Sequence, residues 1–404
     1  MTEEKKERHG LHAVKPGEKK DPDRNFRAEI RSHRFHVLLR WVILIAAVAA
    51  LIFGVLYYFS RKQYTGFEVQ SETEREDTAA TRFELYNDGL LKYSNDGAFY
   101  TDLEGGLIWN QTYEMEQPKA EISGKYVAIG DIGGMNLFIM NELGQQGSIS
   151  TTLPIYAFSV AEQGTLAVLL SGDDTFYLRI YSDAGEELAS GQLHISNSGY
   201  PMALAMSNDG KKLGLSSMFP TGNSVTSTIT FYNFGSVGQN EPDNIVGVYS
   251  YEDMVIPEIH FMSNDTMIAF GDREIQIYSG AQKPEPVETL PVEEEIKSVF
   301  YNNTYFGLIF NNEDEENSRR IEVYDKRCHL HMQQDFVLDY HTAEFLNDNE
   351  VCVRNDYDVK LFGQNGVERF CYTFDVPVYK IVHEHFGMYY TIVCEGSTKK
   401  VRLQ

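Results

Sequence analysis

The sequence predicts an all-β protein: an eight-bladed β-propeller of four-stranded antiparallel blades, closed by an N-terminal strand and preceded by one transmembrane helix. Three observations predict it: an apolar stretch near the N-terminus, a strand-rich repeat with a period near forty residues, and a spare strand ahead of the first repeat. A seven-bladed ring is the alternative. We expect a disordered cytoplasmic tail at 1–36, the transmembrane helix at 37–59 and an extracytoplasmic propeller at 60–404.

The transmembrane segment runs from Val37 to Phe59, and Arg40 is its only charged residue. At ~1.5 Å per residue, this stretch spans ~34 Å, enough for a hydrocarbon core of about 30 Å. Trp41 and Tyr57 are placed like interfacial anchors near its ends. A buried core helix is less favoured, because the stretch is apolar all round and flanked by charges. A cleaved signal peptide is also less favoured, because no small-x-small site follows.

The charge flanking this segment sets the expected orientation. Residues 21–40 contain five arginines, whereas residues 60–79 contain three Lys and Arg residues together. The positive-inside bias therefore places the N-terminus in the cytoplasm and the larger part of the chain outside the plasma membrane. The tail from Met1 to about Asp23 mixes Lys, Glu, Gly and Pro with few apolar residues, so we expect it to be disordered.

The net charge excludes one class of partner. The chain has 35 Lys+Arg against 59 Asp+Glu, a formal net charge of −24. Residues 1–40 carry 11 basic and 7 acidic residues, so the excess negative charge lies entirely in the remaining chain. Such a surface repels phosphate backbones, and we expect no nucleic-acid partner.

The repeat is an apolar strand that runs into a turn rich in Asn, Asp, Ser and Gly. Eight copies align on the following residues: Tyr100, Met140, Tyr181, Tyr232, Tyr278, Tyr324, Phe362 and Gln404. A period near forty in a chain of short strands is the spacing of propeller blades. A two-domain β structure without ring closure is the alternative.

Each repeat resolves into four strands, named a to d in chain order. In the third repeat they are expected at Tyr156–Ala161, Thr165–Ser171, Tyr177–Ser182 and Glu187–Leu193. Proline, which has no N–H to donate, tends to stand just before strand a. The prolines at this position are Pro118, Pro154, Pro201, Pro257 and Pro377.

The last repeat lacks its strand d, because the chain ends directly after the anchor strand at Val401–Gln404. An open edge would expose a row of unpaired backbone groups. The segment Gly66–Thr73 begins with apolar and polar alternation ahead of the first repeat, and we infer that it supplies the missing outer strand. Only a few residues separate it from Phe59, so the ring should lie close to the bilayer.

Two resemblances agree with this interpretation. The stretch Ala98–Asn110, with a Gly turn leading to Trp109, is similar to the repeat of pyrroloquinoline-quinone-type propellers. The chain from Tyr64 to Gln404 resembles an uncharacterised family of membrane-anchored, PQQ-repeat and WD40-like propeller proteins of Gram-positive anaerobic bacteria. The segments that carry this resemblance are Tyr64–Val69, Leu91–Gly97, Ile108–Met115, Val160–Gly164, Phe231–Gln239, Ile268–Asp272 and Ile296–Tyr301. The resemblance implies architecture and location but no activity.

We expect no cofactor. A quinone-dependent dehydrogenase needs a cofactor-stacking Trp, a general-base Asp and usually calcium. The chain has only Trp41, in the membrane segment, and Trp109, in a repeat turn. Nor does the sequence contain a Gly-x-Ser-x-Gly elbow, a phosphate-binding loop or a His-Glu-x-x-His motif, so we expect no enzyme.

A metal site and disulfide bonds are both less favoured than their alternatives. The residues that invite a metal interpretation are Cys328, His329, His331, His341, His383 and His385. They offer no second fixed pair of zinc ligands, and ordinary polar histidines are the preferred interpretation. The cysteines Cys328, Cys352, Cys371 and Cys394 are expected to be buried free thiols. If a disulfide forms, Cys352 and Cys371 are the pair most able to meet.

The loops suggest a binding surface. In a four-stranded blade, the b–c and d–a connections emerge on one face, where carboxylates and rigid tyrosines could together bind a partner. The candidate partner-binding residues are Asp173, Asp174, Asp272, Glu313, Asp314, Glu315, Glu316, Asp356, Tyr113, Tyr200 and Tyr251. Such a face favours a cationic partner segment or Ca²⁺. Ordinary solvated turns are the alternative.

These observations favour a non-enzymatic scaffold that binds a protein partner at the cell envelope. The alternative is a sensor or enzyme for a small ligand or glycan, using the central channel of the propeller. That alternative requires carboxylates or histidines converging on a pocket of about 300 Å³ or more.

Overall fold

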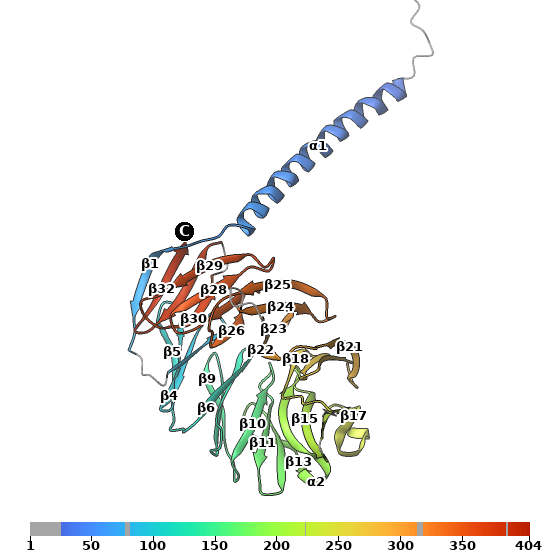
Figure 1. Cartoon of the computed structure of the whole chain (residues 1–404), viewed down its shortest axis with the longest axis vertical. Helices are drawn as coiled ribbons and strands as arrows, with labels where there is room; N and C mark the ends of the chain where they lie inside the picture. Colours follow the sequence, from blue (N-terminus) through green and yellow to red (C-terminus); the bar gives the residue numbers. More distant parts are fainter. Residues whose placement is uncertain (1–25, 77–80, 223, 313–317, 385–386) are drawn as a thin grey trace, which may run out of the picture. The chain divides into compact units, whose positions relative to one another are not determined.

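The computed structural model describes residues 26–76, 81–222, 224–312, 318–384 and 387–404 (Figure 1). The chain divides into two compact units, residues 1–60 and 61–404. Each unit is described by itself below.

The first unit contains helix α1, Phe26–Ser60. Its stretch Arg31–Val55 is long and apolar enough to cross a membrane, judged by length and composition, and protein covers none of its most apolar part. The helix begins eleven residues before the predicted span, so residues 26–36 are helical and not part of a disordered tail. This segment contains three Arg, two Phe and two His residues but no Gly or Pro, so nothing in it ends a helix. The rest of the predicted tail, residues 1–25, lies outside the described residues.

The second unit is an eight-bladed propeller, which confirms the predicted fold and excludes seven blades. The described residues form eight antiparallel sheets of four strands each. Blades one and two are β2 (Arg82–Tyr86), β3 (Gly89–Ser94), β4 (Gly97–Asp102), β5 (Leu107–Thr112), and β6 (Pro118–Ser123), β7 (Tyr126–Asp131), β8 (Asn136–Asn141), β9 (Gly144–Ser150). Blades three and four are β10 (Ile155–Val160), β11 (Leu166–Ser171), β12 (Thr175–Tyr181), β13 (Glu187–His194), and β14 (Tyr200–Met206), β15 (Lys212–Thr221), β16 (Ser224–Asn233), β17 (Ile245–Glu252).

The other four blades follow the same order. Blades five and six are β18 (Glu258–Ser263), β19 (Thr266–Phe270), β20 (Glu274–Ser279), β21 (Glu285–Pro291), and β22 (Ile296–Tyr301), β23 (Tyr305–Asn311), β24 (Arg319–Asp325), β25 (Leu330–Phe336). Blades seven and eight are β26 (Thr342–Phe345), β27 (Val351–Arg354), β28 (Asp358–Phe362), β29 (Glu368–Thr373), and β30 (Val378–His383), β31 (Tyr389–Cys394), β32 (Ser397–Leu403), β1 (Phe67–Glu74). Among the residues that the structure describes, three one-turn helices lie in connections: α2 (Ile195–Ser198), η1 (Gly238–Asn240) and η2 (Pro242–Asn244).

Strand β1 closes the ring, as predicted. It pairs antiparallel with β32, with Phe67 opposite Leu403 and Glu72 opposite Lys399, and so becomes the outer strand of blade eight (Figure 1). The Phe67 ring also packs against Tyr372 of blade seven, with ring centroids 5.0 Å apart. The two ends of the domain are therefore joined by backbone pairing and by a partly buried aromatic contact.

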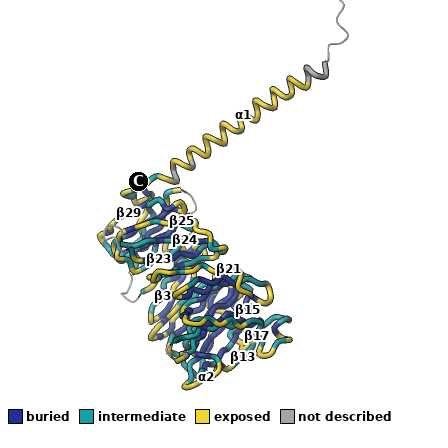
Figure 2. The backbone as a smooth tube through the Cα atoms, turned by 45° about the vertical axis from the view of Figure 1, so that its right-hand side comes forward, coloured by how far each residue is buried: buried dark blue, intermediate teal, exposed yellow. Residues whose placement is uncertain are grey.

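The core lies between neighbouring blades, where one sheet packs on the next (Figure 2). Ala128 and Ile139 of blade two, for example, pack with Leu166 and Val168 of blade three. Along β7 and β11 these residues alternate with others that are equally buried but pack toward the blade on the other side: Val127 and Ile129 toward blade one, and Ala167 and Leu169 toward blade four.

The cysteine prediction needs correction. Strand β28 lies between β27, which carries Cys352, and β29, which carries Cys371. Two strands that flank a third are about 10 Å apart, beyond the reach of a disulfide, which needs Cα atoms within about 7 Å. All four cysteines are free thiols; Cys352 and Cys394 are buried, but Cys371 is exposed.

Candidate functional site

The b–c and d–a connections meet on one face of the propeller, as predicted. Backbone hydrogen bonds join them in several blades: the Met115 N–H donates to the Asn95 carbonyl (2.9 Å), and the Phe374 N–H donates to the Tyr357 carbonyl (2.8 Å). We call the surface made by these connections the acidic face.

The acidic face has a large excess of carboxylates. Its described loops contain fifteen, all exposed: Glu76, Asp96, Glu114, Glu116, Asp173, Asp174, Asp253, Asp272, Glu293, Glu294, Glu295, Asp339, Asp356, Asp375 and Glu395. In the same loops the Lys and Arg residues number two, Arg75 and Arg273, and Arg75 donates to the Cys394 carbonyl (2.7 Å). The loops of the opposite face carry more cations, Lys125, Lys211, Lys283, Lys326 and Arg327, but they also contain more than ten carboxylates, among them Asp88, Glu104, Glu142, Glu186 and Asp243. Both faces are therefore negative, and the excess of carboxylates over cations is larger on the acidic face, which attracts cations more strongly.

The structure brings four predicted acidic residues to this face. Asp173, Asp174, Asp272 and Asp356 are all exposed in its loops. The acidic run Glu313, Asp314, Glu315 and Glu316 lies outside the described residues.

For two of the tyrosines, the prediction of an exposed ring on the binding surface is wrong. Tyr113 is 8% exposed and its ring stacks on Phe138, in the core between blades one and two. Tyr251 is half-buried on β17, and its hydroxyl forms a hydrogen bond with the Tyr278 hydroxyl. Tyr200 is exposed (42%), although one edge of its ring contacts Phe176. An aromatic ring that points between two sheets packs against the neighbouring blade and is buried there. The position of a tyrosine in a loop does not show whether its ring points between the sheets.

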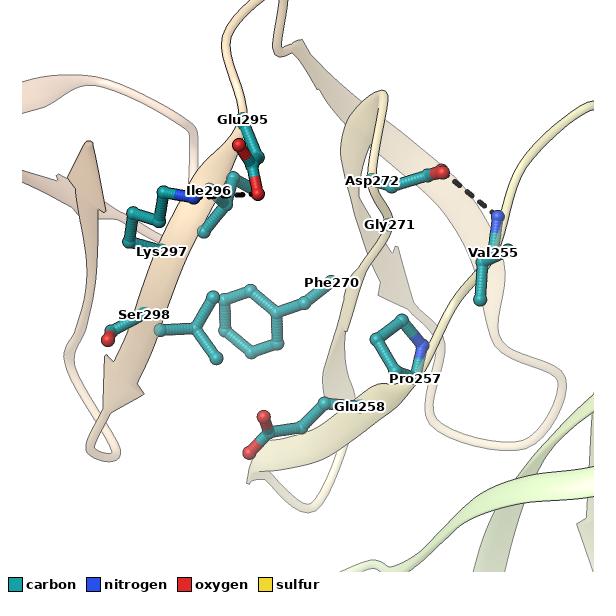
Figure 3. Close-up of a pocket in the computed structure, with 11 residues that line it drawn as sticks. Val255, Pro257, Glu258, Phe270, Gly271, Asp272, Glu295, Ile296, Lys297 and Ser298 are labelled. Carbon is teal, nitrogen blue, oxygen red and sulfur yellow. Dashed lines mark hydrogen bonds and ion pairs between the residues drawn. The ribbon is translucent and has the colours of Figure 1, made fainter. Parts of the chain in front are cut away.

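A cleft of about 460 Å³ opens between blades five and six, next to the predicted residue Asp272 (Figure 3). We call it the blade 5–6 cleft. Its apolar lining is Val255, Pro257, Phe270, Ile296 and Val299. Its charged lining is Glu258, Asp272, Glu295 and Lys297. The loop before β18 and the end of β19 form one wall, and the start of β22 forms the other.

Each charged group at the cleft has a defined contact. Asp272 Oδ1 accepts a hydrogen bond from the Val255 N–H (3.0 Å), and Glu258 Oε1 accepts one from the Tyr301 hydroxyl (2.8 Å). Lys297 Nζ lies 2.7 Å from Glu295. The lining of the cleft thus contains three carboxylates and one ammonium group. Glu258 was not among the predicted residues, although its position directly after Pro257, at the start of strand a, could have indicated it.

A second cavity, of about 270 Å³, lies between the first strands of five successive blades, β6, β10, β14, β18 and β22, as expected for the central channel. It contains Glu121, Ser159, His260 and Tyr301. Glu121 Oε2 accepts a hydrogen bond from the Val160 N–H (3.2 Å), and the His260 ring stacks on Tyr301, with centroids 4.3 Å apart. Sequence reasoning missed these residues, although polar positions on strand a are candidates for the channel wall.

Burial shifts Glu121 and His260 toward their neutral forms. It raises the pKa of Glu121 to about 7, although Lys119, 3.7 Å away, opposes the shift. Burial, with a smaller effect of Lys326, lowers the pKa of His260 to about 4. At neutral pH the imidazole is therefore uncharged and Glu121 is partly protonated.

The shifted carboxyl gives a pH-dependent prediction. The folded pKa of Glu121 lies above its ordinary value of 4.5, so the wild-type free energy of unfolding should fall as pH rises from about 4.5 to about 7. Glu121→Gln, which keeps an oxygen to accept from Val160, should be more stable than wild type by about 2 kcal/mol at pH 8 and equal to it at pH 4. Urea unfolding at the two pH values checks this. A stability difference that does not change with pH would contradict the burial argument.

The histidines pair with carboxylates in different parts of the propeller, and two of them share one carboxylate. His329 and His331 lie 3.3 and 3.4 Å from Asp325, and His383 lies 3.1 Å from Asp348. Among the residues that the structure describes, no group of three or more His, Cys, Asp and Glu could hold a metal ion. His385 lies outside that part of the chain.

Comparison with known proteins agrees with the architecture. The model of a family described as "Family of unknown function (DUF5711)" matches residues 60–403. No curated protein matches the sequence. Among solved structures, the C-terminal WD40 domain of Sif2 is similar at 11% identity with a TM-score of 0.56, covering 84% of this chain and 99% of that one.

Two further solved structures are similar. Sqt1 of Saccharomyces cerevisiae matches at 12% identity with a TM-score of 0.53, covering 85% of this chain and all of that one. BamB of Moraxella catarrhalis matches at 9% identity with a TM-score of 0.47, covering 84% of this chain and all of that one. At these identities the similarity to the Sif2 domain and to Sqt1 concerns the propeller fold alone.

Proposed function

We propose that this chain, which belongs to the DUF5711 family of unknown function, is a membrane-anchored, non-enzymatic scaffold that binds a protein partner through the acidic face of its propeller. The observation that carries the proposal is the charge of that face: fifteen exposed carboxylates against two arginines in its described loops. Complementary charge steers a partner to such a surface and suppresses partners of the same sign. The partner is therefore expected to carry a cationic segment.

Helix α1 supports the anchored part of the proposal. Its apolar stretch Arg31–Val55 is covered by no part of the protein, and an apolar helix of this length is stable when lipid surrounds it. The arginines at 21–40 favour a cytoplasmic N-terminus, which would place the propeller outside the plasma membrane. That the propeller lies close to the bilayer remains a prediction, based on the short connection before β1.

A rigid ring suits a binding role. Every blade is tied to the next by apolar packing, so the loops of the acidic face stand on fixed strands. A rigid surface loses little conformational entropy when it binds. The alternative role, a small-ligand or glycan sensor or enzyme in the central channel, has less support. The cavity there is about 270 Å³, and Glu121 and His260 already have contacts within the protein.

Crosslinking in membranes tests the proposal. A variant with Asp173→Asn, Asp174→Asn, Asp356→Asn and Asp375→Asn should lose most of its crosslinked partner, by about tenfold relative to wild type, because these four exposed carboxylates help attract it. The matched control neutralises four exposed carboxylates of the opposite loops, Glu104, Glu142, Glu186 and Asp243, and should keep the partner.

Raising the salt concentration should weaken capture by the wild type, because exposed charges more than about 10 Å apart are screened at about 0.1 M. If neither variant loses a partner, or if no partner crosslinks to the wild type, the proposal is wrong.

A further inference from the structure

We propose that residues 62–66 form a latch that protects the closing strand β1 from pulling through the membrane anchor. Under the function proposed above, lipid holds the helix before this segment and a partner holds the propeller after it. Any force between the two passes through residues 61–66 before it reaches β1. The inference therefore rests on the anchored scaffold, and it adds how the ring stays closed under load.

Strand β1 is held mainly by its backbone. In the part of the chain that the structure describes, it pairs with β32 alone, as the outer strand of blade eight. Six of its eight residues are exposed, and Phe67 and Thr73 are partly buried. An outer strand with so little buried side-chain area opens from its ends, because few apolar contacts oppose the opening. Since β1 closes the ring, its ends are the places where the ring needs support.

Arg75 supports the end of β1 that leads to blade one. Its N–H donates to the Gly396 carbonyl (2.7 Å), and its guanidinium group donates to the Cys394 carbonyl (2.7 Å). The guanidinium group also lies over the Phe83 ring, 4.8 Å from the ring centroid. A pull from the membrane helix, however, arrives at the other end of β1, at Phe67.

Tyr64 ties that other end to blade seven. Its side chain is 1% exposed and belongs to the apolar core between blades seven and eight. Its N–H donates to the Arg369 carbonyl of β29 (2.7 Å), and the Lys62 ammonium group lies over its ring, 4.8 Å from the centroid. The ring has to leave the core before a pull on the chain can move the residues that follow it.

The next residues tie the chain to blade eight. The Thr65 N–H donates to the Gln404 carbonyl (3.3 Å), and the Gln404 N–H donates to the Gly66 carbonyl (2.9 Å), where the C-terminus lies beside β1 (Figure 1). The Phe67 ring then stacks on Phe374, directly after β29, with centroids 5.6 Å apart. The latch thus bonds to both blades that meet beside the entry of the chain. A pull therefore loads blade seven through Tyr64 before it reaches β1.

The Tyr64 hydroxyl provides a matched control. Among the residues that the structure describes, this buried hydroxyl has no hydrogen-bond partner. Tyr64→Phe keeps the ring in the core and removes only the unpartnered group, so it should hold β1 at least as well as the wild type. Tyr64→Ala removes the ring itself and leaves a cavity between the two blades.

Hydrogen–deuterium exchange of the full-length protein in detergent tests whether the latch holds β1. In Tyr64→Ala, exchange at 67–74 and 397–403 should be faster than in the wild type by about tenfold or more, because the strand end loses its buried contact. In Tyr64→Phe it should stay within about twofold of the wild type. Exchange in blades three and four should not change in either variant. Equal exchange of 67–74 in the two variants would overturn the inference.

Pulling on single molecules tests whether the latch bears load. Magnetic tweezers hold the full-length protein by cysteines introduced at Arg61 and at Asp174, an exposed loop residue of blade three. Cys328 and Cys371, the two cysteines that are not buried, are replaced by serine. The ring should open at a lower force in Tyr64→Ala than in Tyr64→Phe, because the pull then acts directly on Phe67.

Equal opening forces in the two variants would show that β1 resists the pull without the latch and would overturn the inference. If Tyr64→Ala does not fold, Tyr64→Leu replaces it in both measurements, because leucine keeps part of the apolar volume in the core. Neither measurement uses a partner, so the latch can fail while the scaffold function stands. If no partner crosslinks to the wild type while Tyr64→Ala loosens β1 and lowers the opening force, the scaffold function fails and the latch stands.

Discussion

Cysteines introduced at Glu68 and Arg402 should form a disulfide bond that joins the two ends of the propeller domain. These residues are directly opposite each other in the β1–β32 ladder, and both are exposed. Opposite residues of an antiparallel pair have Cα atoms about 4.5–5.5 Å apart, within the range of a disulfide. Because the bond would close a loop from residue 68 to residue 402, the chain-entropy account predicts a stabilisation of about 5 kcal/mol.

Faster migration on a non-reducing gel, and a midpoint of thermal unfolding about 5–8 °C above that of the reduced sample, would show the effect. The exposed Cys371 is replaced by serine in this and the control protein, to prevent mispairing. The control pair is Glu72→Cys with Arg402→Cys, which is out of register because Glu72 lies opposite Lys399. Equally fast oxidation of both pairs would mean that β1 is not fixed in this register.

The fold was predictable because its signals are local and repeated. Tyr181, Tyr278 and Tyr324 each end an anchor strand at the same place in the repeat, and the structure puts each on the third strand of its blade. The spare strand was also predictable, since a ring with an open blade must be completed by some other segment. The start of α1 was not predictable in the same way, because hydropathy identifies only the membrane span. The helix begins earlier, at Phe26, in a polar segment whose residues are compatible with a helix.

The candidate site was predictable only in part. Chain connectivity alone decides which loops share a face, so Asp173, Asp272 and Asp356 were correctly placed together. Tyr113 and Tyr251 were not, because whether a ring is exposed depends on the blade beside it. Phe138 and Tyr278, which cover these two tyrosines, belong to neighbouring blades. The cleft depends likewise on how blade five meets blade six, which no repeat pattern records.

At the inner rim, Lys380→Met should destabilise the propeller by about 3–5 kcal/mol. Lys380, on β30 of blade eight, lies 2.6 Å from Glu344 of blade seven and 3.0 Å from Glu84 of blade one, and its side chain is 13% exposed. Burial opposes its charge, but the two carboxylates outweigh burial and raise the pKa of Lys380. One ammonium group thus joins three blades where the ring closes. Its removal leaves Glu84 without this partner and leaves Glu344 with Arg354 alone, 3.8 Å away.

Urea unfolding of a short series distinguishes this cause from a simple loss of packing. The triple variant Lys380→Met, Glu84→Gln, Glu344→Gln removes the unpaired charges as well, so it should recover most of the lost stability. Lys119→Met is the control, because Lys119 also stands on a first strand but is half exposed and 3.7 Å from Glu121, a pair worth less than about 1 kcal/mol. If the triple variant is as unstable as Lys380→Met, the ion pairs do not stabilise the contact between blades seven, eight and one, where the ring closes. Closure of the ring would then depend on β1 and on the packing of apolar side chains around it.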